Sequence, residues 1–477
     1  MGILSDYVGA GFCEMSVDGH PRPHYQPLAD RFDEMDFDDV ASRVRMVESL
    51  FQRQGTTFAI YDDEEGIERT WPLDLFPRIM PAEEWAVLEA GLTQRVRALN
   101  TFLEDIYTGG QEIINDGVIP RWLVESSSGF MPEAQGIRVA SGARCVISGI
   151  DLVRDGDGVF RVLEDNLRVP SGMSYVLENR VAMTRALPKA FSRYSVRGVS
   201  HFGASLLRTL HAVAPPGVID PTVVVLTPGV YNSAYFEHAF LARQMGVELV
   251  EGRDLVVDDH SVFTRTTKGL RRVDVIYTRV GDEFIDPVAF RPDSVLGVPG
   301  LMASVRSGRV GLANAAGNGV ADDKGVYPYV PEMINYYLDE KAILPNAVTY
   351  LPWEPDQLAV ILARLDELVV KPVAEAGGKG IVFGPDADGS MIERLSSILR
   401  DDPRGYIAQE VIQLSTHPTF GEAGVAPRHI DLRPFVLSSS DHIEVVPGGL
   451  TRVALREGSL VVNSSAGGGS KDTWVLS

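Results

Sequence analysis

Hydrophobic positions in the first quarter of the chain recur at the spacing of amphipathic helices. The stretch FDDVASRVRMVESLFQRQ carries apolar residues three or four positions apart, which predicts a helix. Residues 81–107 open with a proline and two glutamates and then continue the same spacing, which predicts a second, longer helix. We therefore expect an N-terminal helical segment over residues 1–55, followed by a part that begins with the long helix.

Short apolar runs after residue 140 predict strands. ARCVISGIDLV and GVFRVLEDN are joined by RDGDG, a turn sequence, and together they predict an antiparallel hairpin. Pairing in that hairpin would bring Asp151 near Glu164 and Asn166. Because side chains alternate along a strand, Glu164 and Asn166 would share one face while Asp165 points away.

The middle of the chain has the pattern of a parallel α/β unit. A proline-rich linker, HAVAPPGVIDP, precedes the apolar run TVVVLTPG, the helix-like SAYFEHAFLARQMG and the strand-like VELVEG. Strand, helix and strand in this order predict a Rossmann-like domain. Two helical stretches and several short strands then follow, which is typical of an α+β region. We thus expect α/β and α+β folding in four parts: residues 1–55, 56–215, 216–330 and 331–477.

Composition narrows the class of protein. Of 477 residues, 45% are hydrophobic and 23% are charged, as in ordinary globular proteins. The net charge of −21 disfavours nucleic acid and anionic membranes as partners. Two cysteines, Cys13 and Cys145, provide no disulfide framework, and no window approaches 18 apolar residues. The sequence predicts a cytoplasmic protein without a membrane span.

The stretch LVVKPVAEAGGKGIVFG carries the sharpest chemical signal. Lys371 ends a strand, and the loop Gly377-Gly378-Lys379-Gly380 leads into a second strand. Glycines let backbone N–H groups approach phosphate oxygens, and lysines supply compensating charge. The spacing is neither a Walker A motif nor a Rossmann fingerprint. A plain hairpin with a flexible tip is an equally good interpretation of the loop alone.

Two weaker signals accompany this loop. In YIAQEVI an apolar strand ends in Gln409-Glu410, an acid that could accept hydrogen bonds from an adenine or ribose but could equally be solvated. Asp151, Glu164 and Asn166 would form an oxygen site suited to Mg²⁺, although an acidic surface hairpin explains them as well. We interpret Asp322-Asp323-Lys324 as a polar loop that could also face a nucleotide.

Taken together, these motifs resemble the ATP-grasp superfamily of carboxylate–amine ligases in a permuted order. Lys371, the glycine loop, Gln409-Glu410, Asp431-x-Arg433, Arg452 and Asn463 follow one another toward the C-terminus, whereas Asp151 and Glu164-x-Asn166 lie near the N-terminus. Joining the two ends restores the family's order. The stretches VLEDNLRVPSGMSYVLENR, GNGVADDKGVYPYVPEMINYYL and GGGSKDTWVLS resemble the circularly permuted ATP-grasp type 2 group, relatives of glutathionylspermidine synthase.

The resemblance implies a role for each motif. Lys341 and Lys371 would bind ATP phosphates, the glycine loop with Lys379 would close over them, and Gln409 and Glu410 would line the adenine and ribose cleft. Mg²⁺ would be held by Asp151, Glu164 and Asn166. Arg433, Arg452 and Asn463 would serve the transferred phosphoryl group. The relatives carry an arginine two residues before the metal aspartate, where this chain has Gly149, and Arg154 and Arg168 are the candidates to substitute for it.

These roles imply an ATP- and Mg²⁺-dependent ligase that joins a carboxylate to an amine through an acyl phosphate and releases ADP and phosphate. A small acid and an amine or short peptide are the implied substrates. Two other functions remain open at this stage. One is a phosphotransferase on the same scaffold, and the other is a non-catalytic nucleotide-binding module within a peptide-modifying complex.

Overall fold

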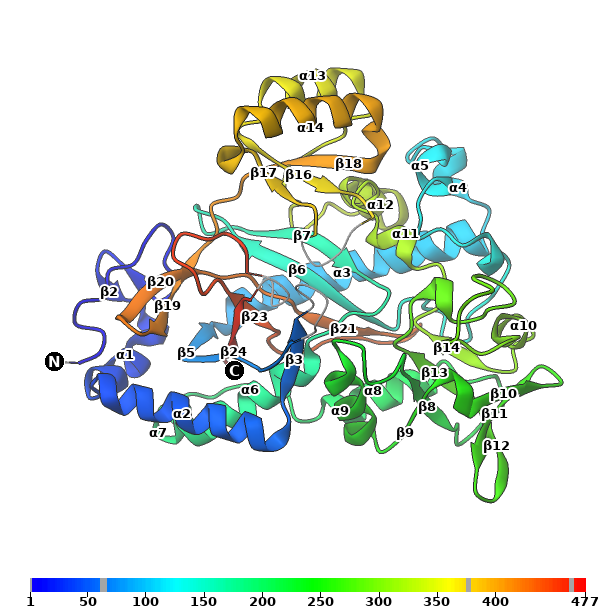
Figure 1. Cartoon of the computed structure of the whole chain (residues 1–477), viewed down its shortest axis with the longest axis horizontal. Coiled ribbons are helices and arrows are strands. Elements are labelled where there is room, and N and C mark those ends of the chain that lie inside the picture. Colours follow the sequence, from blue (N-terminus) through cyan, green and yellow to red (C-terminus); the bar gives the residue numbers. More distant parts are fainter. Residues whose placement is uncertain (1, 61–66, 375–378, 463–466) are drawn as a thin grey trace.

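The computed structural model describes residues 2–60, 67–374, 379–462 and 467–477 of the chain (Figure 1). A short strand pair comes first, and the helix predicted from FDDVASRVRMVESLFQRQ is present as α2. This helix starts in a capping box, in which Asp36 accepts from the backbone N–H of Asp39, and it ends at Gly55 in the left-handed conformation. The elements are β1 (Ser16–Val17), β2 (His20–Pro21), α1 (Gln26–Asp33) and α2 (Phe37–Gln54).

The long helix predicted over residues 81–107 is α3, and its inner side is buried along its whole length. Strands and short helices surround it before the chain reaches the predicted hairpin. These elements are β3 (Thr57–Ile60), β4 (Ile67–Thr70), β5 (Leu73–Met80), α3 (Ala82–Tyr107), α4 (Glu112–Asn115) and α5 (Arg121–Glu125).

The hairpin of β6 and β7 forms as the sequence predicts. Asp151 pairs with Glu164 and Gly149 with Asn166, and a bulge follows Asp151. Asp165 points to the other face, where Arg95 of α3 binds it. The elements here are β6 (Ile147–Arg154), β7 (Phe160–Asn166), α6 (Met173–Ala186), α7 (Pro188–Phe191) and α8 (Phe202–His211).

A parallel sheet in the order β14-β13-β8-β9 forms the Rossmann-like part. Between β9 and β13 the chain forms an antiparallel meander of β10, β11 and β12, which the sequence pattern does not predict. The elements are β8 (Val223–Leu226), α9 (Tyr235–Met245), β9 (Glu248–Val250), β10 (Leu255–Asp258), β11 (Ser261–Thr266), β12 (Gly269–Val273), β13 (Val275–Thr278), α10 (Leu301–Arg306) and β14 (Gly311–Ala313).

The C-terminal third begins with helices and a small outer sheet in the order β15-β18-β16-β17, which α13 and α14 cover at the top of Figure 1. A separate apolar core joins that sheet to the two helices. The elements are α11 (Gly319–Asp322), α12 (Val330–Leu338), β15 (Thr349–Tyr350), α13 (Pro355–Ala363), β16 (Leu368–Pro372), β17 (Val382–Phe383), α14 (Gly389–Asp401) and β18 (Tyr406–Glu410).

The last strands return to the N-terminal half of the chain. β21 pairs with β6 in the sheet β22-β21-β6-β7, and β24 pairs in parallel with β5. The two ends of the chain therefore build one body, as a permuted fold requires. The strands are β19 (Thr416–Gly421), β20 (Gly424–His429), β21 (Phe435–Ser438), β22 (Ile443–Val445), β23 (Thr451–Val453) and β24 (Gly469–Val475).

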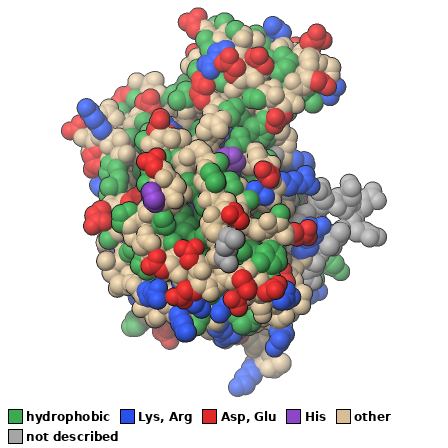
Figure 2. All heavy atoms as spheres, turned by 90° about the vertical axis from the view of Figure 1, so that its left-hand side faces the viewer, with side chains coloured by type: hydrophobic (Ala, Val, Ile, Leu, Met, Phe, Trp, Pro, Cys, Tyr) green, Lys and Arg blue, Asp and Glu red, His purple; other side chains and the backbone are tan. Residues whose placement is uncertain are grey.

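The surface mixes charges of both signs. Acidic, basic and hydrophobic side chains are interspersed over the face shown in Figure 2, and the part with α13 and α14 stands out at its top. Within the described ranges, no helix has the length and apolarity needed to cross a membrane.

Candidate functional site

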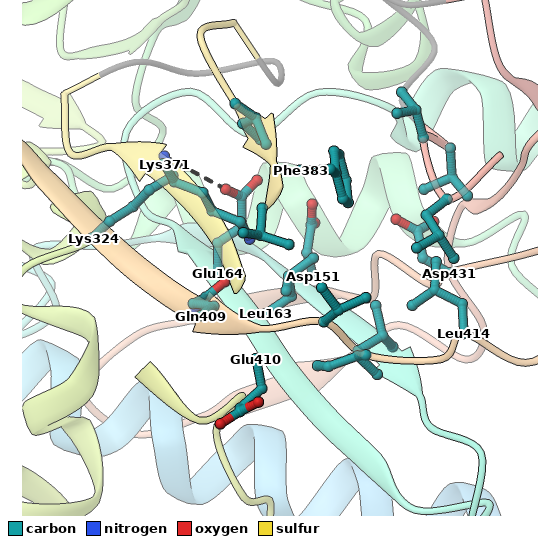
Figure 3. A pocket seen from close by; sticks show the side chains of 18 of the residues that line it. Asp151, Leu163, Glu164, Lys324, Lys371, Phe383, Gln409, Glu410, Leu414 and Asp431 are labelled. Carbon is teal, nitrogen blue, oxygen red and sulfur yellow. Dashed lines mark ion pairs between the residues drawn. The ribbon is translucent and has the colours of Figure 1, made fainter. Parts of the chain in front are cut away.

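A cavity of about 250 Å³ lies between the outer sheet and the β6–β7 hairpin (Figure 3). Strands β6 and β7 supply one wall, and β16, β17 and β18 supply the other. Lys371 and Glu164 line this same cavity although they lie in opposite halves of the chain. Its apolar lining consists of Val153, Leu163, Val369, Pro372, Ile381, Phe383, Val411, Ile412, Leu414, Leu460, Val461 and Val462.

The carboxylate of Asp151 is held by two arginines. Arg433 donates through Nε and Nη2 at 2.5 and 2.7 Å, and Arg452 donates through Nη2 at 2.6 Å. Asp151 is 1% exposed, so these bonds form away from water. The two guanidinium groups hold the pKa of this carboxyl well below its usual range, against the opposing effect of its burial.

Arg452 also binds a second carboxylate. Its Nε lies 3.0 Å from both oxygens of Asp431, and its Nη2 donates to Asp431 as well. All three side chains are nearly inaccessible to solvent. Burial raises the pKa of Asp431, and the neighbouring Asp151 raises it further, while Arg452 opposes both effects. Arg452 therefore bridges two buried carboxylates and keeps them close together.

Gly149 leaves the space that the Arg433 side chain occupies. A Cβ atom at position 149 would lie 3.3 Å from Cδ and 3.4 Å from Cγ of Arg433, and 3.1 Å from Cβ of Pro170. Arg433 therefore crosses the sheet over a glycine to reach Asp151. Of the two substitutes considered from the sequence, Arg154 pairs with Glu84 and Glu14, and Arg168 pairs with Asp322.

Two lysines face Glu164 from the other side of the cavity. The ammonium of Lys324 lies 3.7 Å from the Glu164 carboxylate, and Lys371 of β16 lines the same space. Burial lowers the pKa of Lys371 to about 8; Lys324 adds to this effect, and Glu164 opposes it. Within the described ranges, Lys371 makes no hydrogen bond and no ion pair through its ammonium group.

The side chains of Gln409 and Glu410, at the end of β18, have different partners. The Glu410 carboxylate accepts from the Tyr350 hydroxyl at 2.6 Å and from Arg364 at 2.9 Å, and it points away from Asp151 and Glu164 (Figure 3). These bonds lower the pKa of Glu410. The amide of Gln409 donates to Thr349 at 2.9 Å, while its buried Oε1 lacks a hydrogen-bond partner in the described structure.

The remaining predicted residues fall into three groups. Lys379 lines the cavity, and Gly380 has a positive φ of 72° beside Pro372. Lys341 is exposed in the loop after α12 and is absent from the cavity lining, so the structure does not bring it to the other residues. Lys324, from the polar loop 322–324, occupies the position expected for a second lysine. Gly377, Gly378 and Asn463 lie outside the described residues.

Asn166 and Glu164 lie on the same face of β7, and they suit Mg²⁺ only in part. The Asn166 Nδ2 is buried and lacks a partner in the described ranges, whereas the Glu164 side chain is 29% exposed to the cavity. In the described part of the chain, no three acidic, histidine or cysteine side chains converge to hold a metal. The donor set therefore fits a cation that shares its coordination with phosphate oxygens, as Mg²⁺ commonly does.

Charge in the cavity lining is balanced although the whole chain is acidic. Four carboxylates line the cavity, namely Asp151, Glu164, Glu410 and Asp431, and so do four cations, namely Lys324, Lys371, Lys379 and Arg452. Glu410 is paired with Arg364, which is not part of the lining. Because the whole chain has a net charge of −21, a lining with as many cations as carboxylates is locally less negative than the rest of the protein and suits an anion.

Comparison with known proteins gives one consistent family. The sequence model described as circularly permuted ATP-grasp type 2 matches residues 77–454. An uncharacterised protein of Synechocystis sp. is 55% identical over 458 residues, which is 96% of this chain and 95% of that protein.

Two further similar proteins have descriptive names. A Frankia alni protein, named as a candidate glutamate–cysteine ligase, is 43% identical over 481 residues; the match covers 99% of this chain but only 54% of that protein. Among solved structures, the apo form of a glutathione synthetase-like effector of Globodera pallida has a TM-score of 0.54 at 12% identity, over 93% of this chain and 98% of that one. At this identity the likeness shows the fold alone.

Proposed function

Because the chain belongs to the circularly permuted ATP-grasp type 2 family, we propose that it is an ATP- and Mg²⁺-dependent carboxylate–amine ligase. One observation carries this proposal: strands from both ends of the chain bring Lys371, Glu164, Asp151 and Arg452 to a single cavity. The name of the Frankia alni relative supports the ligase class, although the match leaves almost half of that protein uncovered.

In this proposal the cavity binds ATP along its length. The apolar walls take the adenine, and the unpartnered Oε1 of Gln409 accepts from its amino group. Lys324 and Lys371 bind phosphate oxygens, because both line the cavity and the Lys371 ammonium has no ion-pair partner among the described residues. Glu410, held by Arg364 and Tyr350, contributes through its backbone at the cavity wall.

The chemistry overcomes the poor leaving group of a carboxylate. An oxygen of the acid substrate attacks the γ-phosphorus of ATP, the bond to the β-phosphate oxygen breaks, and ADP leaves. The amine nitrogen then attacks the carbonyl carbon of the acyl phosphate, phosphate leaves with the bonding electron pair, and the nitrogen loses a proton. An amino acid or a short peptide is the substrate class we propose, in line with the name of the Frankia alni relative.

The protein stabilises the transferred phosphoryl group with fixed cations. Arg433 and Arg452 are oriented before any ligand arrives, because each is bound to the buried Asp151. Such preorganised charge is usually the largest protein contribution to phosphoryl transfer. Glu164, Asn166 and Asp151 are the residues that would hold Mg²⁺, which would neutralise phosphate charge there.

A hydroxylamine trap tests the proposal. Incubation with ATP, Mg²⁺ and a panel of amino acids and short peptides should give a hydroxamate that depends on both ATP and the acid. ADP formation without a hydroxamate, together with a stable phosphorylated product, would replace the ligase with a phosphotransferase. If no acid in a broad panel stimulates ATP consumption, the binding-module interpretation is favoured instead.

Glu164→Gln tests whether the activity depends on the charge of this carboxylate in the cavity. The substitution keeps the shape of the side chain and removes one charge, so hydroxamate formation should fall on the order of a hundredfold or more. Glu393→Gln, at an exposed position of α14, is the matched control and should keep full activity. Equal rates for the two variants would remove Glu164 from the proposed machinery.

A further inference from the structure

A second cavity, of about 230 Å³, lies along β14, the edge strand of the Rossmann-like sheet. It shares no lining residue with the first cavity. Its walls come from the 134–144 segment, the proline-rich linker before β8, helix α10 and the strand β14. Most of this lining is apolar, and the only charged side chains in it are Arg138 and Arg144.

Arg144 is the unusual member of this lining. Its side chain is 1% exposed, and its two terminal nitrogens donate to the backbone carbonyls of Ile137 at 2.9 Å and Ala316 at 3.1 Å. The guanidinium also lies over the ring of Tyr107, 4.5 Å from its centre. Its Nε, however, is buried without a hydrogen-bond partner in the described residues.

The other buried arginines show what Arg144 lacks. In the described ranges each of them forms an ion pair with a carboxylate, and Arg144 forms none. The five pairs are Arg78 with Glu14, Arg95 with Asp165, Arg180 with Asp472, Arg279 with Glu237, and Arg452 with Asp431. A buried charge without a directly paired carboxylate is costly, and burial lowers the pKa of Arg144 against the opposing, more distant effects of Tyr107, Glu104 and Asp282.

We propose that this second cavity binds a small carboxylate with an apolar body, and that the carboxylate pairs with Arg144. The apolar lining takes the body of the ligand, and the buried guanidinium supplies the charge and an unused donor. Arg138, which is exposed in the same lining, adds a second cation at the surface. This proposal does not depend on the ligase activity, because the two cavities have separate linings.

Calorimetry on the full chain tests this site directly. The probes are hexanoate, 4-methylpentanoate and phenylacetate, each compared with its uncharged amide. We expect saturable binding of at least one carboxylate and at least tenfold weaker binding of the matching amide. If no carboxylate binds, or if acid and amide bind equally, the proposal is overturned.

Substitutions in each cavity show which of the two binds the carboxylate. Arg144→Gln should weaken binding of the carboxylate at least tenfold. Since that substitution removes buried contacts, Val305→Trp provides a second variant: it fills the cavity from α10, leaves Arg144 in place, and should also abolish binding while circular dichroism shows a retained fold. Lys371→Ala, in the first cavity, should bind the carboxylate like the unsubstituted protein. Displacement of the carboxylate by a non-hydrolysable ATP analogue would assign it to the first cavity and refute the proposal.

Discussion

The two walls of the first cavity are stabilised in different ways. On the wall formed by β6 and β7, Asp151 accepts hydrogen bonds from Arg433 and Arg452, so the protein itself neutralises its buried charge. On the wall formed by β16, Lys371 lacks such a partner in the described structure, and burial lowers its pKa to about 8. The charge of Asp151 is therefore neutralised within the protein, whereas the charge of Lys371 would be neutralised by a bound anion.

This difference determines whether a substitution in the cavity changes the stability of the protein or its affinity for a ligand. Breaking a buried ion pair leaves an uncompensated charge, and that cost appears in the free energy of unfolding. Removing an unpaired, partly desolvated lysine relieves a cost in the free protein and removes a contact only in the complex. Substitutions on the wall that carries Asp151 should therefore change stability, and substitutions on the wall that carries Lys371 should change affinity.

The largest expected effect is the loss of stability in Arg452→Met. This substitution leaves Asp151 and Asp431 buried side by side without their shared partner, which should cost about 3–5 kcal/mol in the free energy of unfolding. Urea denaturation measures that cost. Arg364→Met is the control, because its pair with Glu410 is partly exposed and should contribute far less to stability. Similar losses in both variants would show that the Asp151–Arg452–Asp431 contact is not a buried network.

The second effect is the loss of nucleotide affinity in Lys371→Ala. Removing a charge-assisted contact to phosphate should cost about 1.5–3 kcal/mol, roughly ten- to a hundredfold in the dissociation constant of ATP. The free energy of unfolding should stay the same or increase. Lys341→Ala is the matched control, since Lys341 is exposed away from the cavity, and it should bind ATP normally. The reverse result, with Lys341 essential and Lys371 dispensable, would contradict the geometry.

The pH dependence of ATP binding is a third, smaller effect. Lys371 has a pKa of about 8 in the free protein instead of its ordinary 10.5. Below pH 8 it is already protonated, so affinity should be flat; above pH 8 binding must take up a proton, so affinity should fall by up to about tenfold per pH unit. Calorimetry in two buffers of different ionisation enthalpy would detect this proton uptake. Lys371→Arg should flatten the profile, and an unchanged profile in that variant would attribute the titration to another group.

The same lysine has a predictable effect on stability. Between pH 8 and 10.5 the unfolded chain binds more protons at position 371 than the folded chain does. The contribution of this residue to the free energy of unfolding should therefore rise with pH across that window. Comparing the unsubstituted protein with Lys371→Ala over this range isolates the contribution from that of other groups.

Local patterns in the sequence predicted much of the fold. The long helix α3, the β6–β7 hairpin with Asp151 opposite Glu164, and the parallel β8–α9–β9 unit each follow from spacing over a few turns or strands. The β10–β12 meander was missed because β12 is exposed on both faces and has no apolar alternation to detect. The division of the chain at residues 55, 215 and 330 stays a prediction.

Contacts between distant residues could not be predicted in this way. Arg433 and Asp151 are 282 positions apart, and the pairing of β21 with β6, extended by the bridge of Leu432 to Leu152, brings them together. The choice between Lys341 and Lys324 is of the same kind. Both lie in polar loops, so their neighbours in the sequence do not distinguish them, and only the folded chain brings Lys324 to Glu164.

The smallest expected effect belongs to Glu410→Gln. A role in binding the ribose or adenine would make this carboxylate essential, but it is held by Arg364 and Tyr350 and points away from the other carboxylates. The substitution removes a partly exposed ion pair, so ATP affinity should change by no more than about 1 kcal/mol, roughly fivefold. Gln409→Leu should reduce affinity more, because it removes the unpartnered acceptor Oε1 at the cavity wall. If Glu410→Gln instead weakens ATP binding as strongly as Lys371→Ala, the carboxylate must release Arg364 and turn toward the nucleotide when it binds.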